Sequence, residues 1–408
     1  MALTKVKGSV LDSAETISDK AEAVLITPTA GRTLQVISGD GGLFKAVTGA
    51  AAATYSDDGG SYCGTVFIPT GGDGSTAWIR DYIGLGANPL WFGATGAGDD
   101  TVALQATLDF GGAMVIPEGT FSFTNLVIDN FEEITIQGAS RLGTTLACTA
   151  ASGIGIRFKG TSRCVVEKLR ITGNATADVG LQIDTDTATK YPFTFAMSDV
   201  EIRSFTKTGA VALVVEGVSH MQLQNMNLDA ENGTGMEISG DAFNTGVFAF
   251  NNVFFNSKSG DYGLYIKTGS AIDSMAFVGC YFAGTLAAER IGDGTNNVNA
   301  ISHIGCHYEN NSAVAGAALI HIAGGSGLGA KSLTWNACQF GGFSVCENAF
   351  KYDSGYYYGH TIENCSFQGI KATGYIIADH ASAVFKDCQI KSMFTATTTP
   401  NNFLTNNF

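Results

Sequence analysis

Polar, aromatic and histidine side chains recur at one position of a short repeated strand, a spacing that places them on one surface. The repeats read KLRIT, DVEIR, NMNLD, NVFFN, GCYFA, GCHYE, ACQFG, NCSFQ and DCQIK. Successive side chains of a strand point to opposite faces, so the middle residue points outward when its two apolar neighbours point inward. The first outward column is Arg170, Glu201, Asn227, Phe254, Tyr281, His307, Gln339, Ser366 and Gln389. The second outward column adds Arg203, Asp229, Asn256 and Glu309.

Two acids of these columns, Glu201 and Asp229, have a spacing suited to glycoside hydrolysis. They lie on neighbouring repeats and are offset by two positions along the strand. One strand spacing of ~4.8 Å and two residues of ~6.6 Å combine to roughly 8 Å between the Cβ atoms. Inverting hydrolysis uses carboxyl groups about 6.5–9.5 Å apart. Glu201 and Asp229 are therefore predicted as the catalytic pair, although the same spacing also arises by chance wherever acids decorate such a surface.

Three further groups of residues remain open as catalytic candidates. His307 and Glu309 form a possible acid/base pair on one strand. Asp184 and Asp186, in the segment DTDTATK, form another, although Asp also favours turns for backbone reasons. The loop DSGYYYGH at 353–360 offers tyrosine and histidine for sugar contacts or for proton transfer in an elimination. Three adjacent tyrosines cannot all point inward, so we expect at least one of them to be exposed.

An aromatic stripe forms the candidate binding surface. Phe254, Tyr281 and His307 follow one another in the first outward column and are expected to stack on three successive repeats. Sugar rings pack their C–H faces against such side chains, while nearby carboxylates and amides take their hydroxyl groups. A contact between subunits explains the same stripe equally well, because exposed apolar patches often mark interfaces. Ordinary surface is a third explanation.

The repeat predicts the fold. The first apolar residues of the copies lie 23 to 32 residues apart, from Leu169 to Cys388, with no helical pattern between them. Short strands at such a period indicate a parallel β-helix in which each copy is one strand of a coil. Further strand-like segments, such as GLQI at Gly180 and GMEI at Gly235, support about ten coils. Ile134 and Ile136 are expected to supply the same apolar pair in an earlier coil.

Five cysteines occupy the inward position that Leu, Val or Met fills in earlier repeats. They are Cys280, Cys306, Cys338, Cys365 and Cys388. Metal ligands converge on one point, whereas this pattern arranges thiols in a row, so we expect interior packing and neither a metal nor a cofactor.

Composition narrows the classes of partner. The 408 residues carry 23 basic and 37 acidic side chains, a formal charge of −14, which disfavours nucleic acid. No apolar run approaches the roughly 20 residues of a membrane span, so we expect no membrane insertion. The N-terminal segment has no apolar core and contains Asp12, Glu15, Asp19 and Glu22, so we expect no secretory signal and synthesis in a cytoplasm.

Two consecutive motifs resemble known modules. The segment WIRDYIGLGANPLWFGATGAGDDTVALQATLD (78–109), followed by GGAMVIPEGT, resembles the opening of right-handed parallel β-helix domains of the pectate-lyase-like superfamily. That resemblance implies a helix, Thr101 to Asp109, that caps the first coil. Asp99 and Asp100 are expected to cap its free amides. Val102, Leu104, Leu108 and Phe110 are expected to supply its apolar contacts. The chain has only GAGDD where the family often carries a longer acidic run.

The segment 38–82 is similar to the small β-rich module that precedes such β-helices in bacteriophage tailspikes. The resemblance implies an all-β, single-stranded, right-handed parallel β-helix with a capping helix and a small N-terminal β module. The implied domains are a virion-attachment segment (1–37), the β module (38–90), the β-helix (91–390) and a C-terminal strap (391–408).

The resemblance also implies a function. A homotrimeric tailspike or tail-fibre protein of the virion would bind other phage tail proteins through its N-terminus and recognise a capsule or lipopolysaccharide glycan of the host. Two classes stay open: a depolymerase acting by hydrolysis or elimination, and a non-catalytic structural fibre or adhesin. A free bacterial polysaccharide lyase fits less well, given the absence of a signal and the module at 38–82.

Overall fold

A computed structural model of the chain describes most of its residues. The described ranges are 14–37, 41–81, 86–184, 194–239, 245–267, 272–293, 298–310, 312, 316–324, 330–341, 346, 348–353, 357–368, 375–378 and 383–390. The chain divides into two compact units, Met1–Pro117 and Glu118–Phe408. The expected C-terminal strap lies outside the described residues. Among the helices that are described, none is long and apolar enough to cross a membrane.

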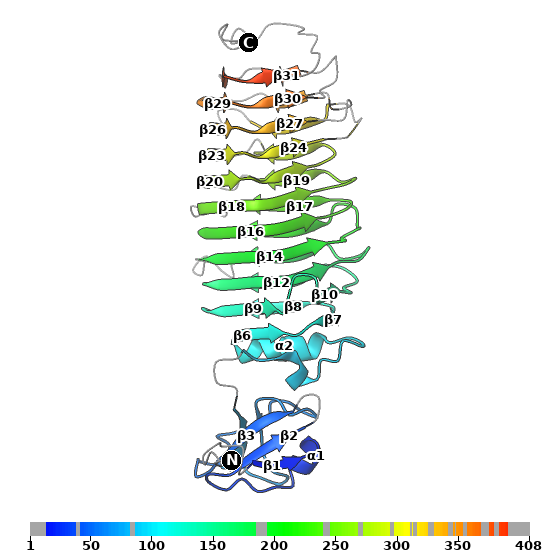
Figure 1. Cartoon of the computed structure of the whole chain (residues 1–408), viewed down its shortest axis with the longest axis vertical. Helices are drawn as coiled ribbons and strands as arrows, with labels where there is room; N and C mark the ends of the chain where they lie inside the picture. Colours follow the sequence, from blue (N-terminus) through cyan, green and yellow to red (C-terminus); the bar gives the residue numbers. More distant parts are fainter. Residues whose placement is uncertain are drawn as a thin grey trace, which may run out of the picture. The chain divides into compact units, whose positions relative to one another are not determined.

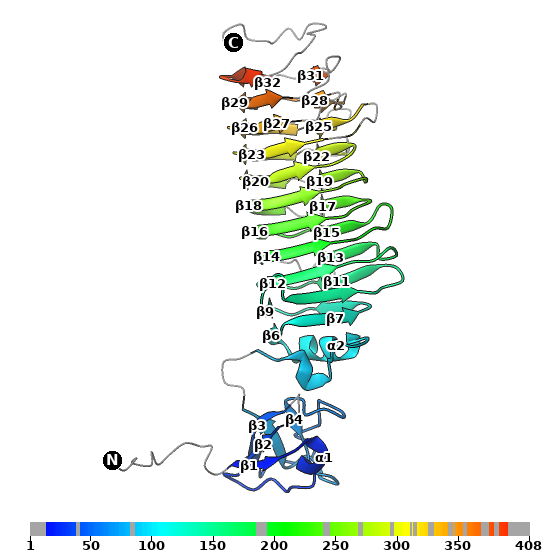
Figure 2. The ribbon, with the colours of Figure 1, turned by 45° about the vertical axis from the view of Figure 1, so that its right-hand side comes forward.

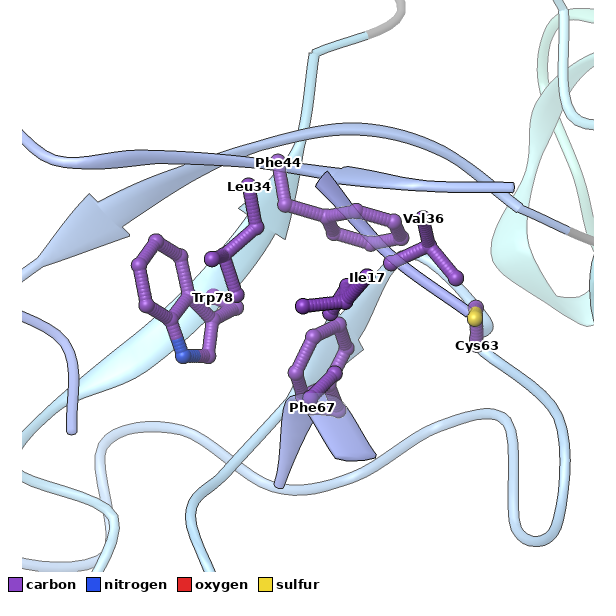
Figure 3. Packing of buried hydrophobic residues seen from close by; sticks show 8 residues of the cluster. Ile17, Leu34, Val36, Phe44, Cys63, Phe67 and Trp78 are labelled. Atoms are coloured by element: carbon purple, nitrogen blue, oxygen red, sulfur yellow. The ribbon is translucent and has the colours of Figure 1, made fainter. Parts of the chain in front are cut away.

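The first unit contains a small five-stranded sheet. Its strands, in the order β1-β2-β3-β5-β4, are β1 (Ala14–Ile17), β2 (Thr33–Val36), β3 (Gly42–Val47), β5 (Ala77–Arg80) and β4 (Val66–Phe67). The short helix α1 (Lys20–Ala23) follows β1. Figure 3 shows the hydrophobic core of this sheet, where the indole of Trp78 also donates to the carbonyl oxygen of Ile26 at 3.0 Å. The core side chains are Ile17, Ala23, Leu34, Val36, Phe44, Cys63, Phe67 and Trp78.

The helix expected after the sheet is present as α2 (Thr101–Phe110), preceded by the 3₁₀ helix η2 (Pro89–Phe92) and followed by β6 (Gly112–Ile116). Asp99 accepts the N–H of Thr101 at 3.0 Å, as a cap should. Asp100 was expected to do the same, but its carboxylate accepts the N–H of Thr95 at 2.8 Å and fixes the preceding loop.

The apolar contacts of α2 come from a narrower face than the sequence suggested. Leu104 and Leu108, one turn apart, are buried. Val102 and Phe110 are 83% and 39% exposed, so the expectation that they pack inward was wrong. Each lies two positions from a buried leucine, and such residues point to different sides of a helix.

The second unit is a parallel β-helix (Figure 1) whose strands belong to two sheets. A bend divides the larger sheet into two faces, A and B, and the smaller sheet is face C. Face B carries the repeat found in the sequence. Its separate strands are β7 (Gly119–Phe123), β10 (Thr144–Cys148), β21 (Tyr281–Ala283), β24 (His307–Glu309), β27 (Gln339–Gly341), β30 (Ser366–Gln368) and β33 (Gln389–Ile390). Face A precedes it in each coil, with β9 (Ile134–Gly138), β20 (Ile272–Val278), β23 (Val298–Ile304), β26 (Ala330–Asn336), β29 (His360–Glu363) and β32 (Ala383–Lys386).

Four long strands run through faces A and B in the middle coils. They are β12 (Cys164–Thr172), β14 (Phe195–Arg203), β16 (His220–Asp229) and β18 (Thr245–Asn256). Face C is a ten-stranded sheet, one strand per coil. Its strands are β8 (Leu126–Asp129), β11 (Ile154–Lys159), β13 (Val179–Asp184), β15 (Val211–Glu216), β17 (Thr234–Ser239), β19 (Tyr262–Ile266), β22 (Ala287–Ile291), β25 (Ala318–Ile322), β28 (Asn348–Tyr352) and β31 (Tyr375–Ala378).

A bend with positive φ separates face A from face B, directly before the first apolar residue of each repeat. The residues at the bend, all with φ between 52° and 61°, are Lys168, Asp199, Asn225, Asn252, Gly279, Gly305, Ala337, Asn364 and Asp387. Gly, Asn and Asp adopt this conformation at low cost, which explains their predominance here. The side chain of Asn252 also donates to Asn225 Oδ1 at 2.9 Å, and Asn225 donates to Asp199 Oδ1 at 3.2 Å.

The interior of the upper coils is filled by stacked rings. Phe255, Phe282, Tyr308, Phe340 and Phe367 form a continuous stack with centroids 4.7 to 4.9 Å apart. That separation matches the distance between neighbouring strands, so the coil spacing itself sets ideal ring stacking.

The cysteines and the earlier isoleucines complete the interior. Four of the five cysteine side chains of the repeat are buried, while Cys388 is half-buried, and all five are free thiols. Their interior position confirms the predicted register. Ile134 and Ile136 were assigned to the wrong face: they lie in β9 of face A, where Ile136 pairs with Val166. On face B the partner of Ile171 is Leu146.

Candidate functional site

The first outward column of face B has the predicted register over nine coils. Each member pairs with the next across parallel strands, from Arg170 with Glu201 to Ser366 with Gln389. The second column is confirmed where Asp229 pairs with Asn256 and Ala283 with Glu309. Strand alternation thus placed these side chains correctly.

The aromatic stripe exists as expected. Phe254 and Tyr281 have ring centroids 5.4 Å apart, and Tyr281 and His307 stack at 5.3 Å with an interplanar angle of 9°. Phe254 is 45% exposed. Rings on three coils therefore form a surface open to a ligand or to another subunit.

Glu309 and Gln339 supply polar groups beside this stripe. The phenol of Tyr281 donates to the carboxylate of Glu309 on the next coil. Burial, together with this carboxylate, raises the pKa of Tyr281, which keeps the phenol protonated. His307 Nδ1 lies 3.3 Å from the amide oxygen of Gln339. The structure therefore brings His307 and Glu309, both on β24, into contact with Tyr281 of the preceding coil, His307 through ring stacking and Glu309 through a hydrogen bond.

Glu201 lies on the predicted coil, but its side chain is largely buried and fully engaged. Arg170 donates to it at 2.6 Å, Asn227 at 3.0 Å and Arg203 at 3.4 Å. Only 9% of its side chain is exposed. Both carboxylate oxygens are therefore occupied by protein donors, which leaves little of Glu201 free to contact a substrate.

Asp229, two positions further along the next coil, has a different environment. Burial raises the pKa of its carboxyl group, although Lys258 at 3.9 Å opposes the shift. Its Oδ1 atom is buried without a hydrogen-bond partner. A raised pKa suits a general acid, but 9% exposure of the side chain leaves little room for a substrate.

The aspartate pair predicted near the end of β13 is only partly described. Asp184 is buried and accepts from Arg157 at 2.7 Å and from Gln182 at 2.9 Å. Asp186 lies outside the described residues. The contacts of Asp184 give this carboxylate a structural role on face C.

In the tyrosine loop, His360 is buried between the Ala330 carbonyl oxygen at 2.9 Å and the phenol oxygen of Tyr352 at 3.1 Å. Tyr357 is also buried, while Tyr358 is 52% exposed, which confirms that one tyrosine faces outward. Tyr356 lies outside the described residues.

Face C carries a carboxylate cluster that the sequence analysis missed. Asp184, Glu216 and Glu237 project from β13, β15 and β17, and Gln182 Nε2 lies 2.9 Å from Asp184 and 3.4 Å from Glu216. Burial raises the pKa of Glu216, and the carboxylates of Asp184 and Glu237 raise it further. A carboxyl group of raised pKa beside two further carboxyl groups has the composition that glycoside hydrolysis requires. The alternation in DVGLQID, VALVVE and GMEIS contained the signal, but the triplet repeat marks only face B.

The described residues hold no group of three or more His, Cys, Asp or Glu side chains arranged to bind a metal ion. The reactive groups that these side chains offer are carboxyl, phenol, imidazole and guanidinium groups.

Among the comparisons with known proteins, only the comparison with solved structures gave matches. No protein-family model matches the chain, and no curated protein matches it. Tailspike protein 2 of an Escherichia coli O157:H7 bacteriophage is 17% identical with a TM-score of 0.66 over 92% of this chain, which spans only 52% of that protein. The tailspike of an Acinetobacter baumannii bacteriophage, described as a capsular polysaccharide depolymerase, is 13% identical with a TM-score of 0.59 over 95% of this chain and 76% of its own.

A bacterial enzyme is also similar. The A-module of a mannuronan C-5 epimerase from Azotobacter vinelandii is 15% identical with a TM-score of 0.51, covering 77% of this chain and 99% of its own. Identities this low establish the fold alone. The chain has the parallel β-helix fold that is also found in phage tailspike proteins.

Proposed function

We propose that this chain is part of a phage tailspike, a virion receptor-binding protein that recognises a surface polysaccharide of the host through the aromatic stripe. The stripe is the observation that carries the proposal. Phe254, Tyr281 and His307 form a continuous row of stacked rings on three successive coils, and Glu309 and Gln339 lie beside it. Sugars pack their C–H groups against an aromatic surface of this kind, while the polar groups beside it hydrogen-bond to their hydroxyl groups. The structural similarity to several phage tailspikes supports the same assignment.

Binding assays with stripe variants test the proposal. Phe254→Ala and Tyr281→Ala should each weaken binding to host cells and to their purified polysaccharide by about tenfold or more, since one stacked ring contributes about 1–3 kcal/mol. Tyr62→Ala, which removes a partly exposed tyrosine of the first unit, is the matched control and should bind normally. Unchanged binding by both stripe variants would refute the stripe as the receptor site.

Assembly belongs to the same proposal. We infer a homotrimer, with the N-terminal part of the chain attached to other tail proteins. If the stripe is instead a subunit contact, Phe254→Ala should reduce the native mass while leaving glycan affinity per subunit unaltered. That result would favour a non-catalytic structural fibre.

Cleavage of the polysaccharide is a second candidate function, favoured by the raised pKa values of Asp229 and Glu216. Asp229 is the acid of the pair predicted from the sequence, with Glu201 as the second carboxylate. Glu216 is the corresponding acid on face C. Release of oligosaccharides by the unmodified protein, together with loss of release in Glu216→Gln but not in Asp229→Asn, would assign the reaction to face C. The reverse result would assign it to face B.

A further inference from the structure

A column of basic side chains runs along the outer side of face C. Arg290 on β22 pairs with His321 on β25, and His321 pairs with Lys351 on β28. We call these three residues the cationic column. The strands β19, β22, β25 and β28 that carry and precede it lie one above another in Figure 2. Each side chain is half-buried, while the residues on either side along its strand are buried in the interior.

The described residues neutralise this column only in part. His321 Nε2 lies 3.0 Å from the carboxylate of Asp353, and no other carboxylate of the described residues lies within ion-pair distance of the column. Arg290 donates to the phenol oxygen of Tyr262 at 2.6 Å, and its guanidinium lies over the rings of Tyr262 and Tyr265. Its Nε atom is buried without a hydrogen-bond partner.

Arg290 and Lys351 lie two strand spacings of ~4.8 Å apart, with His321 between them. Burial lowers the pKa of His321, and the Lys351 and Arg290 cations act in the same direction against the opposing carboxylate of Asp353. The lowered pKa favours a neutral imidazole, so His321 can hydrogen-bond to a ligand between the two cations. In a chain with a formal charge of −14, two cations for which the described residues show no ion pair point to an anionic ligand.

The coils that precede the column carry the opposite charge. Glu237 on β17 pairs with Tyr265 on β19, and Tyr265 pairs with Arg290. Lys267 lies 2.6 Å from Glu237, and the carboxylate cluster continues to Glu216. Face C therefore changes along its length from acidic to basic.

We propose that face C binds an acidic polysaccharide, with a carboxylate-bearing sugar held by Arg290 and Lys351 and neutral sugars hydrogen-bonded by Glu216 and Glu237. This inference rests on the proposed glycan recognition and narrows it to glycans in which acidic and neutral sugars alternate.

The same features argue against nucleic acid as the ligand. A nucleic acid carries a charge at every residue, so part of its backbone would face Glu216 and Glu237 and be repelled. Single-stranded nucleic acids also need free aromatic faces for stacking, and Arg290 covers both Tyr262 and Tyr265.

Variants of equal charge test the inference. The double variant Arg290→Gln, Lys351→Gln is compared with Lys258→Gln, Lys386→Gln, which removes two exposed lysines from other parts of the coils. The probes are hyaluronan, in which acidic and neutral sugars alternate, neutral dextran and a single-stranded oligonucleotide. Affinities are measured at several salt concentrations on full-length protein whose melting temperature has been checked.

The expected results are specific. The unmodified protein should bind hyaluronan at least tenfold more tightly than dextran, and the face C double variant should lose about tenfold while the control double variant stays within about twofold. If Arg290→Gln reduces folding, Lys351→Gln alone should still lower both the affinity and its salt dependence.

Four outcomes would overturn the inference. Equal losses in both double variants would show a general charge effect, and equally tight oligonucleotide binding would show a nucleic-acid site. Hyaluronan binding that survives the face C variant but is lost in Phe254→Ala would leave the proposed function standing and remove face C from it. Failure of the unmodified protein to bind any glycan, including that of host cells, would refute both.

Discussion

Glu201 and Glu309 both point outward from strands of face B, yet their neighbours give them different roles. Glu201 is surrounded by donors from Arg170, Arg203 and Asn227, while Glu309 accepts from the phenol of Tyr281. The first arrangement satisfies a carboxylate and connects three successive coils. The second places a carboxylate beside a half-buried ring of the stripe. At the scale of one residue, the partners on adjacent coils determine whether an outward carboxylate has a structural role or can take part in binding.

The first prediction concerns Glu201. Glu201→Gln should lower the free energy of unfolding by about 1–3 kcal/mol, because it leaves Arg170 partly buried without its counter-ion. Glu363→Gln is the matched control. It breaks the ion pair with Lys386, which is 58% exposed, and should change stability by no more than about 0.5 kcal/mol.

Urea denaturation of both variants measures the difference. Equal stability of Glu201→Gln and the unmodified protein would show that the ion pairs of Glu201 do not stabilise the fold.

The sequence predicted where these side chains lie, but not how exposed they are. Period-two alternation determines that Glu201 points outward, and it does so in the structure. Its burial depends on Arg170 and Asn227, which are one coil away and 31 and 26 residues distant in the chain. Each belongs to a correctly predicted column. The sequence did not predict which long side chains cover Glu201, because a pattern of residue types does not determine side-chain rotamers.

At the scale of one element, the bend before each strand of face B shows how the backbone conformation of one residue determines the course of the coil. The bend requires positive φ, and seven of the nine positions are Gly, Asn or Asp. Ala337 and Lys168 are the two exceptions, with φ of 54° and 55°. A Cβ in the left-handed region costs roughly 1–2 kcal/mol.

The second prediction follows from that cost. Ala337→Gly should raise the free energy of unfolding by about 0.5–1 kcal/mol, because the left-handed strain disappears while glycine loses more entropy on folding. Ala276→Gly on β20, where the strand is extended, is the control and should lower stability by a similar amount. Opposite signs in thermal unfolding confirm the assignment, and two losses of stability would contradict it.

A stack of rings inside face A includes a histidine that contacts a buried glutamate of face C. His303 lies between Phe277 and Trp335, and its Nε2 is 3.0 Å from the fully buried carboxylate of Glu289, which also accepts from Tyr308 at 3.1 Å. Burial alone lowers the pKa of His303, but the Glu289 carboxylate outweighs burial and the pKa lies above its usual value.

The third prediction is a pH dependence of stability. A histidine whose pKa is raised by folding contributes stability that is fully present below the unfolded pKa of about 6.5 and is lost as the pH rises through the folded value. The melting temperature should therefore fall on the alkaline side of pH 6.5. Glu289→Gln keeps the shape of the side chain and removes the charge, so this fall should be smaller in the variant. Identical pH profiles would exclude the His303–Glu289 pair as the cause.

The strands were predicted where the sequence repeat is periodic and were missed where the period is interrupted. Face B was found because an apolar-polar-apolar triplet recurs in every copy. Face A was not separated from it, since residues such as Asn225 and Asn252 interrupt the alternation at the bend. A single residue in the left-handed conformation shifts the alternation of apolar and polar residues by one position. Because this shift was not recognised, Ile134 and Ile136 were assigned to the wrong face.

For the whole molecule, face A offers the surface best suited to another subunit. Its outward column contains the small side chains of Ala249, Ala276 and Ser302 on successive coils. The adjacent column adds Val278 and Ile304, which are 42% and 47% exposed. Small residues make a flat surface, and exposed valine and isoleucine side chains gain free energy when another chain covers them. The stripe of face B remains free for a glycan in that arrangement.

The last prediction is that three chains associate through face A. The native mass of the unmodified protein should be three times 42.5 kDa. Ala276→Glu places a charge in the centre of the flat column, where burial without a partner is costly, so this variant should run as a monomer at micromolar concentration. Gln339→Glu introduces the same charge on exposed face B and should remain trimeric. Light scattering coupled to size-exclusion chromatography distinguishes the two masses. A trimer that tolerates Ala276→Glu but dissociates in Phe254→Ala would move the subunit contact to the aromatic stripe and remove the stripe as the glycan site.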